Sequence, residues 1–167
     1  VLLAAIFGFL PHVDERLRAS VLAIDEELTE NGFVLRYLTD ETDDGLSGKE
    51  GTFLICSFWL VSALAIIGEQ QRARDLMERL LRIASPLGLY AEEFETSTAR
   101  HLGNFPQAFS HLALIEAAGR IILAEFALPP HKLAGFVAVS PRTGYLDQIV
   151  VAPEARGACP VGGGRAA

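Results

Sequence analysis

The sequence predicts an all-α fold with two layers of helices in residues 1–126, followed by a short tail that resembles a β-hairpin. Residues 53–67 are almost entirely apolar, which is typical of a helix that is buried on most sides. Residues 70–84 are apolar on one face and charged on the other. A buried helix beside an amphipathic one indicates an inner and an outer layer, and residues 1–126 show no alternation of strands with helices.

The composition provides enough apolar residues for a packed core. Half of the 167 residues are hydrophobic, 21% are charged, and the formal net charge is -7. Because phosphate binding requires clustered Lys and Arg, this acidic balance argues against a nucleic-acid partner. Cys56 and Cys159 form no disulfide framework, which favours a cytoplasmic location, and the four histidines lack zinc-binding spacing. We expect neither a metal nor a cofactor.

The first ten residues are apolar but match neither a signal peptide nor a membrane span. No basic segment precedes them, and Pro11 ends the run well short of the roughly 20 apolar residues that cross a bilayer. We therefore expect a buried core helix and no membrane partner. The apolar start, with Val1 in place of Met, indicates a fragment of a longer protein.

The other elements follow from periodicity and from turn residues. Helices 53–67 and 70–84 are joined by a short connection and should run antiparallel. The remaining predictions are a helix at 14–30 closed by Asn31-Gly32, a small strand or extended arm at 33–38, loops at 39–50 and 85–100, and a helix at 106–126 with Pro106 in its first turn.

The composition changes at Leu128-Pro129-Pro130, which predicts a boundary between a helical domain at 1–126 and a tail at 127–167. Within the tail, residues 135–140 and 145–151 are predicted to be strands. The turn sequence Pro141-Arg142-Thr143-Gly144 separates them.

The acidic segment Tyr90–Glu95 is the first candidate for chemistry. Glycoside hydrolysis uses two carboxyl groups that flank one bond. Adjacent residues of an extended segment point to opposite sides, so Glu92 and Glu93 cannot be that pair. At most one of them acts as a base, and the alternative is a solvated acidic loop.

Two further segments carry polar groups. Residues 104–111 place amide, hydroxyl and imidazole groups at the start of a helix, where they can hydrogen-bond sugar hydroxyls or, alternatively, cap the helix and fill the core. Ser110 and His111 are adjacent and lack the third group of a nucleophilic triad. The glycine-rich loop at 45–53 lacks the Gly-Lys-Ser/Thr ending of a phosphate-binding P-loop.

Four stretches, taken in order, resemble glycoside hydrolase family 15, the glucoamylase- and trehalase-like family. They are FGFLP at 7–11, GLSGKEGTFLICSFWLV at 45–61, GLYAEEFE at 88–95 and LGNFPQAFSHLALIEAA at 102–118. The resemblance implies that residues 1–126 form the C-terminal part of an (α/α)6 barrel. It also implies inverting hydrolysis of α-glucosidic bonds by two glutamates.

The family's Ala-Glu-Gln/Glu motif corresponds to Ala91-Glu92-Glu93, so the resemblance implies Glu92 as the general base and Glu93 if the register is shifted by one. The substrate implied is an α-glucoside: trehalose, or a malto- or isomalto-oligosaccharide. The residues expected to bind it are Glu50, Trp59, Gln107, Ser110 and His111.

The resemblance also sets what the chain should lack. The family's general acid lies in the N-terminal half of the barrel, so we expect this fragment to hydrolyse little or nothing alone. Barrel helices without their partners should expose apolar faces and self-associate.

The tail has a separate resemblance. GFVAVSPRTGYLDQIVVAPEARG at 135–157 is similar to the central strands and the acetyl-CoA pyrophosphate loop of GNAT acetyltransferases, although Cys159-Pro160 departs from the pattern. The rival hypothesis is therefore a fragment of an acetyl-CoA-dependent N-acetyltransferase. A third is a helical module without catalytic activity.

Overall fold

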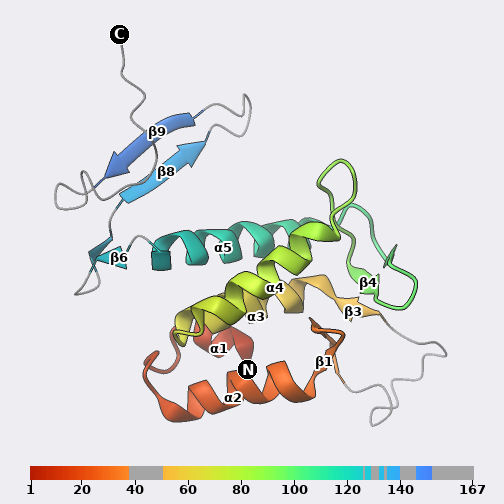
Figure 1. Cartoon of the computed structure of the whole chain (residues 1–167), viewed down its shortest axis with the longest axis horizontal. Helices are drawn as coiled ribbons and strands as arrows, with labels where there is room; N and C mark the ends of the chain where they lie inside the picture. Colours follow the sequence, from red (N-terminus) through yellow and green to blue (C-terminus); the bar gives the residue numbers. More distant parts are fainter. Residues whose placement is uncertain (38–50, 126, 129–131, 134, 140–145, 152–167) are drawn as a thin grey trace. The chain divides into compact units, whose positions relative to one another are not determined.

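A computed structural model describes residues 1–37, 51–125, 127–128, 132–133, 135–139 and 146–151 (Figure 1). The chain divides into two compact units, Val1–Ile121 and Ile122–Ala167, which we describe separately. The division falls inside the last helix, a few residues before the predicted boundary at 126.

The first unit is mainly helical, with two small antiparallel sheets. Its helices are α1 (Leu2–Ile6), α2 (Glu15–Glu27), α3 (Leu54–Ile66), α4 (Gln70–Arg82) and the first part of α5 (Ala108–Glu125). One sheet pairs β1 (Thr29–Glu30) with β2 (Phe33–Val34), and the other has the order β3 (Thr52–Phe53), β4 (Glu93–Glu95), β5 (Arg100–Leu102).

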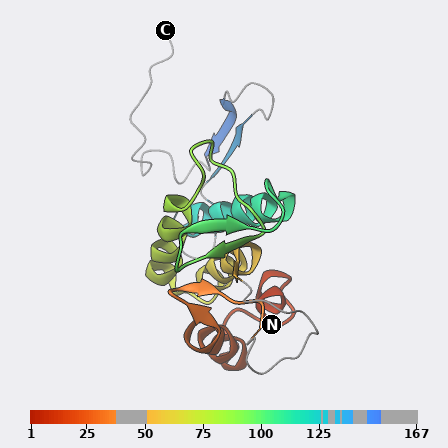
Figure 2. The same ribbon diagram turned by 90° about the vertical axis from the view of Figure 1, so that its right-hand side faces the viewer.

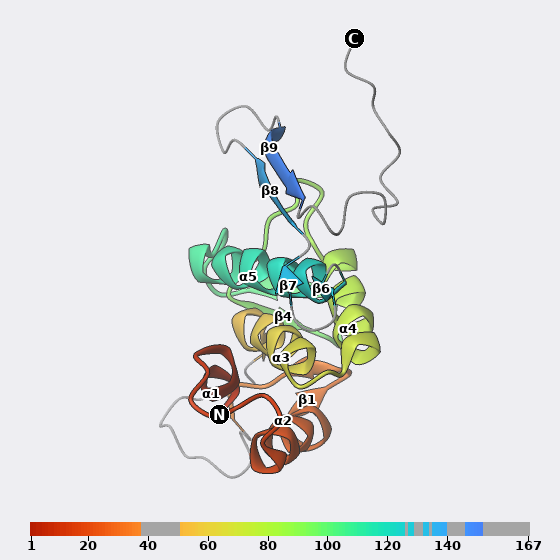
Figure 3. The same cartoon turned by 90° about the vertical axis from the view of Figure 1, so that its left-hand side faces the viewer.

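Helix α3 forms the centre of this unit. Figure 3 shows it between α1 and α2 on one side and α5 on the other, and α4 packs alongside it. Leu54, Phe58 and Leu60 of α3 are completely buried. Each such side chain contributes roughly 1.5–3 kcal/mol relative to an exposed one. The predicted buried helix is therefore confirmed.

Helix α4 covers the core with one face, as predicted. Ala73, Leu76 and Leu80 are buried, while charged residues such as Glu78 and Arg82 face solvent. Gly68, with a φ of +86°, lies in the short connection that follows α3. A left-handed residue of this kind is the usual signal for the end of a helix.

The start and end of α2 follow from local sequence. The Asp14 side chain caps the helix by accepting a 2.9 Å hydrogen bond from the backbone amide of Arg16. Asn31 and Gly32 both have positive φ and connect β1 to β2. The predicted helix was therefore too long at its C-terminal end, because Thr29–Glu30 belong to the hairpin.

The all-α prediction missed the strands β4 and β5, which lie in and directly after the segment 85–100 that was taken as a loop. There β4 pairs antiparallel with β3 and with β5 (Figure 2). In this register Phe94 lies opposite Thr52 and His101. Buried Thr52 ties the sheet together by donating its hydroxyl to the carbonyl of Phe94 at 2.8 Å. Strands of two or three residues are too short for an alternating pattern to be read from sequence.

The apolar N-terminus forms a shorter helix than predicted. Leu2 and Ala5 of α1 are buried, but the helix ends at Ile6, and Phe7 and Phe9 are 79% and 80% exposed. Gly8, with a φ of +65°, turns the chain directly after the helix. In the described part of the chain, no helix has the length and apolarity to cross a membrane.

The second unit contains short strand pairs. β6 (Ala127–Leu128) pairs with β7 (Lys132–Leu133), and β8 (Gly135–Val139) pairs antiparallel with β9 (Leu146–Val151). The two predicted strands of the tail are confirmed. The predicted turn at 141–144 and the cofactor loop that would follow Val151 lie outside the described residues. The acetyltransferase interpretation therefore stays a prediction.

Candidate active site

The segment Tyr90–Glu93 leads into β4 and begins at a buried residue, Tyr90. Tyr90 is 1% exposed, and its hydroxyl donates a 3.0 Å hydrogen bond to the carbonyl of Leu80 in α4. Its ring meets Phe58 of α3 edge to face, with 5.4 Å between centroids. Burial raises the pKa of the Tyr90 hydroxyl, which keeps it protonated as a donor.

Two histidines hold the backbone of this segment. The ring nitrogen Nε2 of His111 accepts from the amide of Tyr90 at 3.3 Å, and Nδ1 of His101 accepts from the amide of Ala91 at 3.4 Å. The second nitrogen of each ring faces a carbonyl: Gln107 at 2.7 Å for His111 and Ile83 at 2.9 Å for His101. Each ring therefore bridges a backbone amide and a backbone carbonyl, which fixes its orientation.

The start of α5 completes this support. Ser110 is completely buried and donates its hydroxyl to the carbonyl of Ala91 at 2.8 Å. The backbone amide of Gln107 donates to the carbonyl of Tyr90 at 2.9 Å. Three of the predicted sugar-binding residues, Gln107, Ser110 and His111, are thus brought together, and each holds or adjoins the backbone that leads to Glu92.

Glu92 follows this anchored backbone and is half-buried. Its carbonyl accepts from the amide of Leu54 at 3.1 Å, and its amide donates to the carbonyl of Asn104 at 3.0 Å. Its carboxylate oxygen Oε2 accepts from the side-chain Nδ2 of Asn104 at 2.9 Å and from the backbone amide of Asn104 at 3.3 Å. The charged side chain is therefore held in one orientation by a single exposed loop residue.

A close backbone approach makes this contact possible. Gly103 has a φ of +71°, and a Cβ at this position would stand 3.0 Å from Oε2 and 3.1 Å from Cβ of Glu92. The left-handed angle and the lack of space both select glycine. The β5–α5 loop can approach Glu92 because a glycine precedes Asn104.

Glu93 contacts a different segment. Its Oε2 accepts a 2.9 Å hydrogen bond from the backbone amide of buried Gly51, next to β3. A Cβ on Gly51 would stand 3.1 Å from the carbonyl oxygen of Phe94, so this glycine too lies at a close approach. The two adjacent carboxylates reach different neighbours, as expected for consecutive residues of an extended chain.

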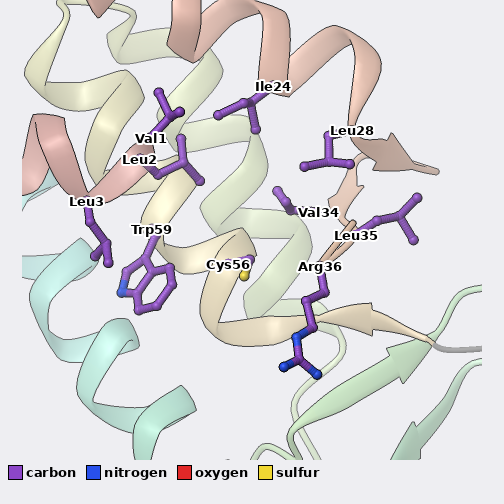
Figure 4. Close-up of a pocket in the computed structure, with 10 residues that line it drawn as sticks. All are labelled: Val1, Leu2, Leu3, Ile24, Leu28, Val34, Leu35, Arg36, Cys56 and Trp59. Atoms are coloured by element: carbon purple, nitrogen blue, oxygen red, sulfur yellow. The ribbon is translucent and has the colours of Figure 1, made fainter. Parts of the chain in front are cut away.

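The other predicted site residues are not part of this cluster. Glu50 lies outside the described residues. Trp59 lines a separate pocket of about 170 Å³ that α1, α2, β2 and α3 border (Figure 4). Cys56 lies in the same pocket, where burial raises the pKa of its thiol and so disfavours the reactive thiolate. Among the described residues, no group of three or more potential ligands could hold a metal ion.

Sequence reasoning missed the roles of His101, Gly103 and Asn104. Asn104 was considered as a helix cap or a sugar contact, but its partner is the carboxylate of Glu92. The available signal was a glycine followed by an amide residue shortly after an acidic strand. That signal does not show which carboxylate the loop approaches. The choice depends on the register between β4 and β5, and strands of three residues do not reveal their register in the sequence.

Comparison with known proteins identifies the family. Residues 1–119 match the glycosyl hydrolases family 15. The chain is 67% identical over 125 residues to a trehalase of Mycolicibacterium smegmatis, and 66% identical over 125 residues to a trehalase of Mycobacterium tuberculosis. A trehalase of Thermoplasma acidophilum is 40% identical over 116 residues. The chain belongs to glycosyl hydrolase family 15.

These matches cover most of this chain but a small part of each relative. The M. smegmatis alignment covers 75% of this chain and 19% of that protein, the M. tuberculosis alignment 75% and 18%, and the T. acidophilum alignment 70% and 20%. The chain therefore spans about a fifth of the length of these relatives. No solved structure matches it. The tail lies beyond the family match, which ends at residue 119.

Proposed function

We propose that this chain supplies the general base, Glu92, for inverting hydrolysis of an α-glucosidic bond, and that trehalose is the substrate. The family match supports the reaction class, and the relatives with 66–67% identity carry the name trehalase. Because the chain spans about a fifth of those relatives, we propose that it acts as one segment of a longer catalytic domain.

The chemistry requires two carboxyl groups about 6.5–9.5 Å apart. The oxygen of a water molecule attacks the anomeric carbon while Glu92 takes a proton from that water. The bond from the anomeric carbon to the leaving oxygen breaks, its electron pair stays on that oxygen, and a carboxylic acid on the opposite face protonates it. Trehalose and water thus give two glucose molecules. We propose that the acid comes from another segment of the enzyme, as the family resemblance implies.

The observation that carries the assignment of Glu92 is the way its carboxylate is held. Asn104 donates both of its hydrogen bonds to Oε2 of Glu92. We therefore propose that the other carboxylate oxygen, Oε1, receives the proton from the water. The carboxylate of Glu93 is held at a different place, by the backbone amide of Gly51 next to β3, and Glu93 stays the alternative base. A general base has to be within hydrogen-bond reach of the water it activates.

The helix arrangement supports a barrel as the complete fold. Apolar α3 is surrounded by helices, and amphipathic α4 covers it with one face, as an inner and an outer helix of an (α/α)6 barrel would. We propose that residues 1–121 form part of such a barrel. Glucoamylase-type substrates, maltose and isomaltose, are the alternatives to trehalose.

A chimera tests the proposal. Residues 1–125 of this chain replace the aligned segment of the M. smegmatis trehalase, and glucose release is measured with trehalose, maltose and isomaltose. We expect trehalose hydrolysis, a loss of kcat by several orders of magnitude in Glu92→Gln, and a much smaller loss in Glu93→Gln. Near-normal turnover of Glu92→Gln would disprove the role of Glu92. The isolated chain should release little or no glucose.

A further inference from the structure

Asn104 is joined to Glu92 through both its backbone and its side chain. The two residues are twelve positions apart, and three hydrogen bonds join them: amide to carbonyl at 3.0 Å, and two N–H groups to Oε2 at 2.9 and 3.3 Å. Asn104 is exposed, so its amide could bond to water at little cost. The bonds to Glu92 therefore order the half-buried side chain of this glutamate.

Other residues already hold the backbone of this region. His101, Ser110 and His111 bind the amides and the carbonyl of Tyr90 and Ala91 from buried or half-buried positions. The side chain of Asn104 adds nothing to that backbone support, because its Nδ2 bonds to the carboxylate. Its effect is on the direction of one carboxylate oxygen.

We propose that Asn104 is a positioning residue for the general base. This inference rests on the proposed role of Glu92. Two donors that converge on Oε2 fix the carboxylate plane and aim Oε1 at the position of the attacking water. Asn104 acts through Glu92 and does not touch the reacting atoms.

The first experiment uses the chain itself and needs no activity. The side-chain amide resonances of Asn104 are followed by NMR as the solution is acidified. In the wild type they should move together with the carboxyl resonance of Glu92, and in Glu92→Gln this movement should disappear. If the amide resonances of Asn104 do not follow the carboxyl resonance of Glu92 in the wild type, the inference is overturned.

The second experiment measures kinetics in the trehalase chimera described above. Asn104→Ala should lower kcat at least about tenfold, because a displacement of about 1 Å at a reacting group costs up to about a hundredfold. KM for trehalose should stay within about twofold, since no substrate contact is lost. Asn104→Asp keeps the size but replaces the donor, so it should be no better than Ala. Asn104→Gln keeps the amide and should recover part of kcat.

The matched control is Gln71→Ala. Gln71 is also exposed, and its side-chain amide also donates to a carboxylate, that of Asp75 at 2.8 Å, but on α4. It should leave kcat and KM unchanged. Unchanged kcat in Asn104→Ala would overturn the inference, and so would a change confined to KM, which would make Asn104 a substrate contact. In both cases an inactive Glu92→Gln would leave the proposed function standing, whereas an active Glu92→Gln would disprove that function.

Discussion

Gly103 and Glu92 approach each other so closely that a Cβ on the glycine would stand 3.0 Å from the carboxylate oxygen Oε2 and 3.1 Å from Cβ of the glutamate. Gly88 has almost the same backbone angle, a φ of +73° against +71°, but has open space at its Cβ position. Substitutions at Gly88 and Gly103 therefore distinguish the effect of backbone strain, which both share, from the effect of contact with Glu92, which only Gly103 has.

We expect Gly88→Ala to lower the free energy of unfolding by about 1–2 kcal/mol, because it places an L side chain at a left-handed angle. Gly103→Ala should lower it by more, because its Cβ also crowds Glu92. Only Gly103→Ala should also displace Glu92, and so lower kcat in the chimera. Urea unfolding of the chain and turnover of the chimera measure the two effects. Equal turnover in the two variants would show that the close approach has no effect on Glu92.

Tyr90 gives a pH dependence of stability. Burial raises the pKa of its hydroxyl, so the folded chain holds this proton more tightly than the unfolded chain does. The stabilisation is complete below the ordinary tyrosine pKa of about 10 and is lost as the pH rises above that value. We expect the free energy of unfolding to fall between about pH 9.5 and 11, measured by urea titration at each pH.

The matched variants for this prediction are Tyr90→Phe and Tyr37→Phe. Tyr90→Phe removes the hydrogen bond to Leu80, so it should cost about 1 kcal/mol at neutral pH and flatten the alkaline decline. Tyr37 is only partly buried, so Tyr37→Phe should keep that decline. A decline of equal slope in Tyr90→Phe would assign it to another group.

Ser110 distinguishes backbone support from sugar binding. Its hydroxyl is completely buried and bonds to the carbonyl of Ala91, so Ser110→Ala leaves that carbonyl without this partner. We expect a loss of about 1–3 kcal/mol in the free energy of unfolding. Exposed Ser97, mutated to Ala, should change it by less than about 0.5 kcal/mol. A KM increase in the chimera without a stability loss would instead favour a sugar contact.

The helices of the first unit were predictable because their signals are long. Helix α3 has thirteen residues without a charge, and α4 has thirteen residues with apolar side chains on one face. Patterns of this length are typical of a buried and an amphipathic helix. The β3–β4–β5 sheet was not predictable, since its strands have two or three residues and β3 pairs with a segment some 40 positions away. Its register decides that Glu92 meets Asn104 while Glu93 meets Gly51.

The same limit applies to the candidate site. The motif around Ala91 implied Glu92 as the base through the family resemblance, and this role stays a prediction. The chemistry of two carboxylates argued against Glu92 and Glu93 as the catalytic pair, because adjacent residues point to opposite sides. The polar residues at the start of α5 were recognised as a group. Their contacts could not be predicted, because a buried hydroxyl such as that of Ser110 and an exposed one look alike in sequence.

The outer face of α5 leads to a prediction about association. Phe105, Phe109, Leu112 and Ile115 recur at steps of three or four residues and are all more than half exposed. The helical spacing places Phe109, Leu112 and Ile115 on one side of α5, where they form an apolar stripe, and Phe105 lies in the loop that leads into the helix. A second copy of the chain offers an identical stripe. We expect the chain to self-associate through α5, with a weight-average mass that rises with concentration.

Sedimentation equilibrium of Leu112→Glu checks this prediction, with Leu87→Glu as the control. Both leucines are exposed, at 61% and 83%, but Leu87 lies in the loop between α4 and β4, away from the stripe. A charge in the middle of a buried apolar contact is costly to desolvate, so Leu112→Glu should weaken association at least about tenfold. Leu87→Glu should not change it. A wild-type chain that stays monomeric, or equal association of both variants, would exclude α5 as the contact surface.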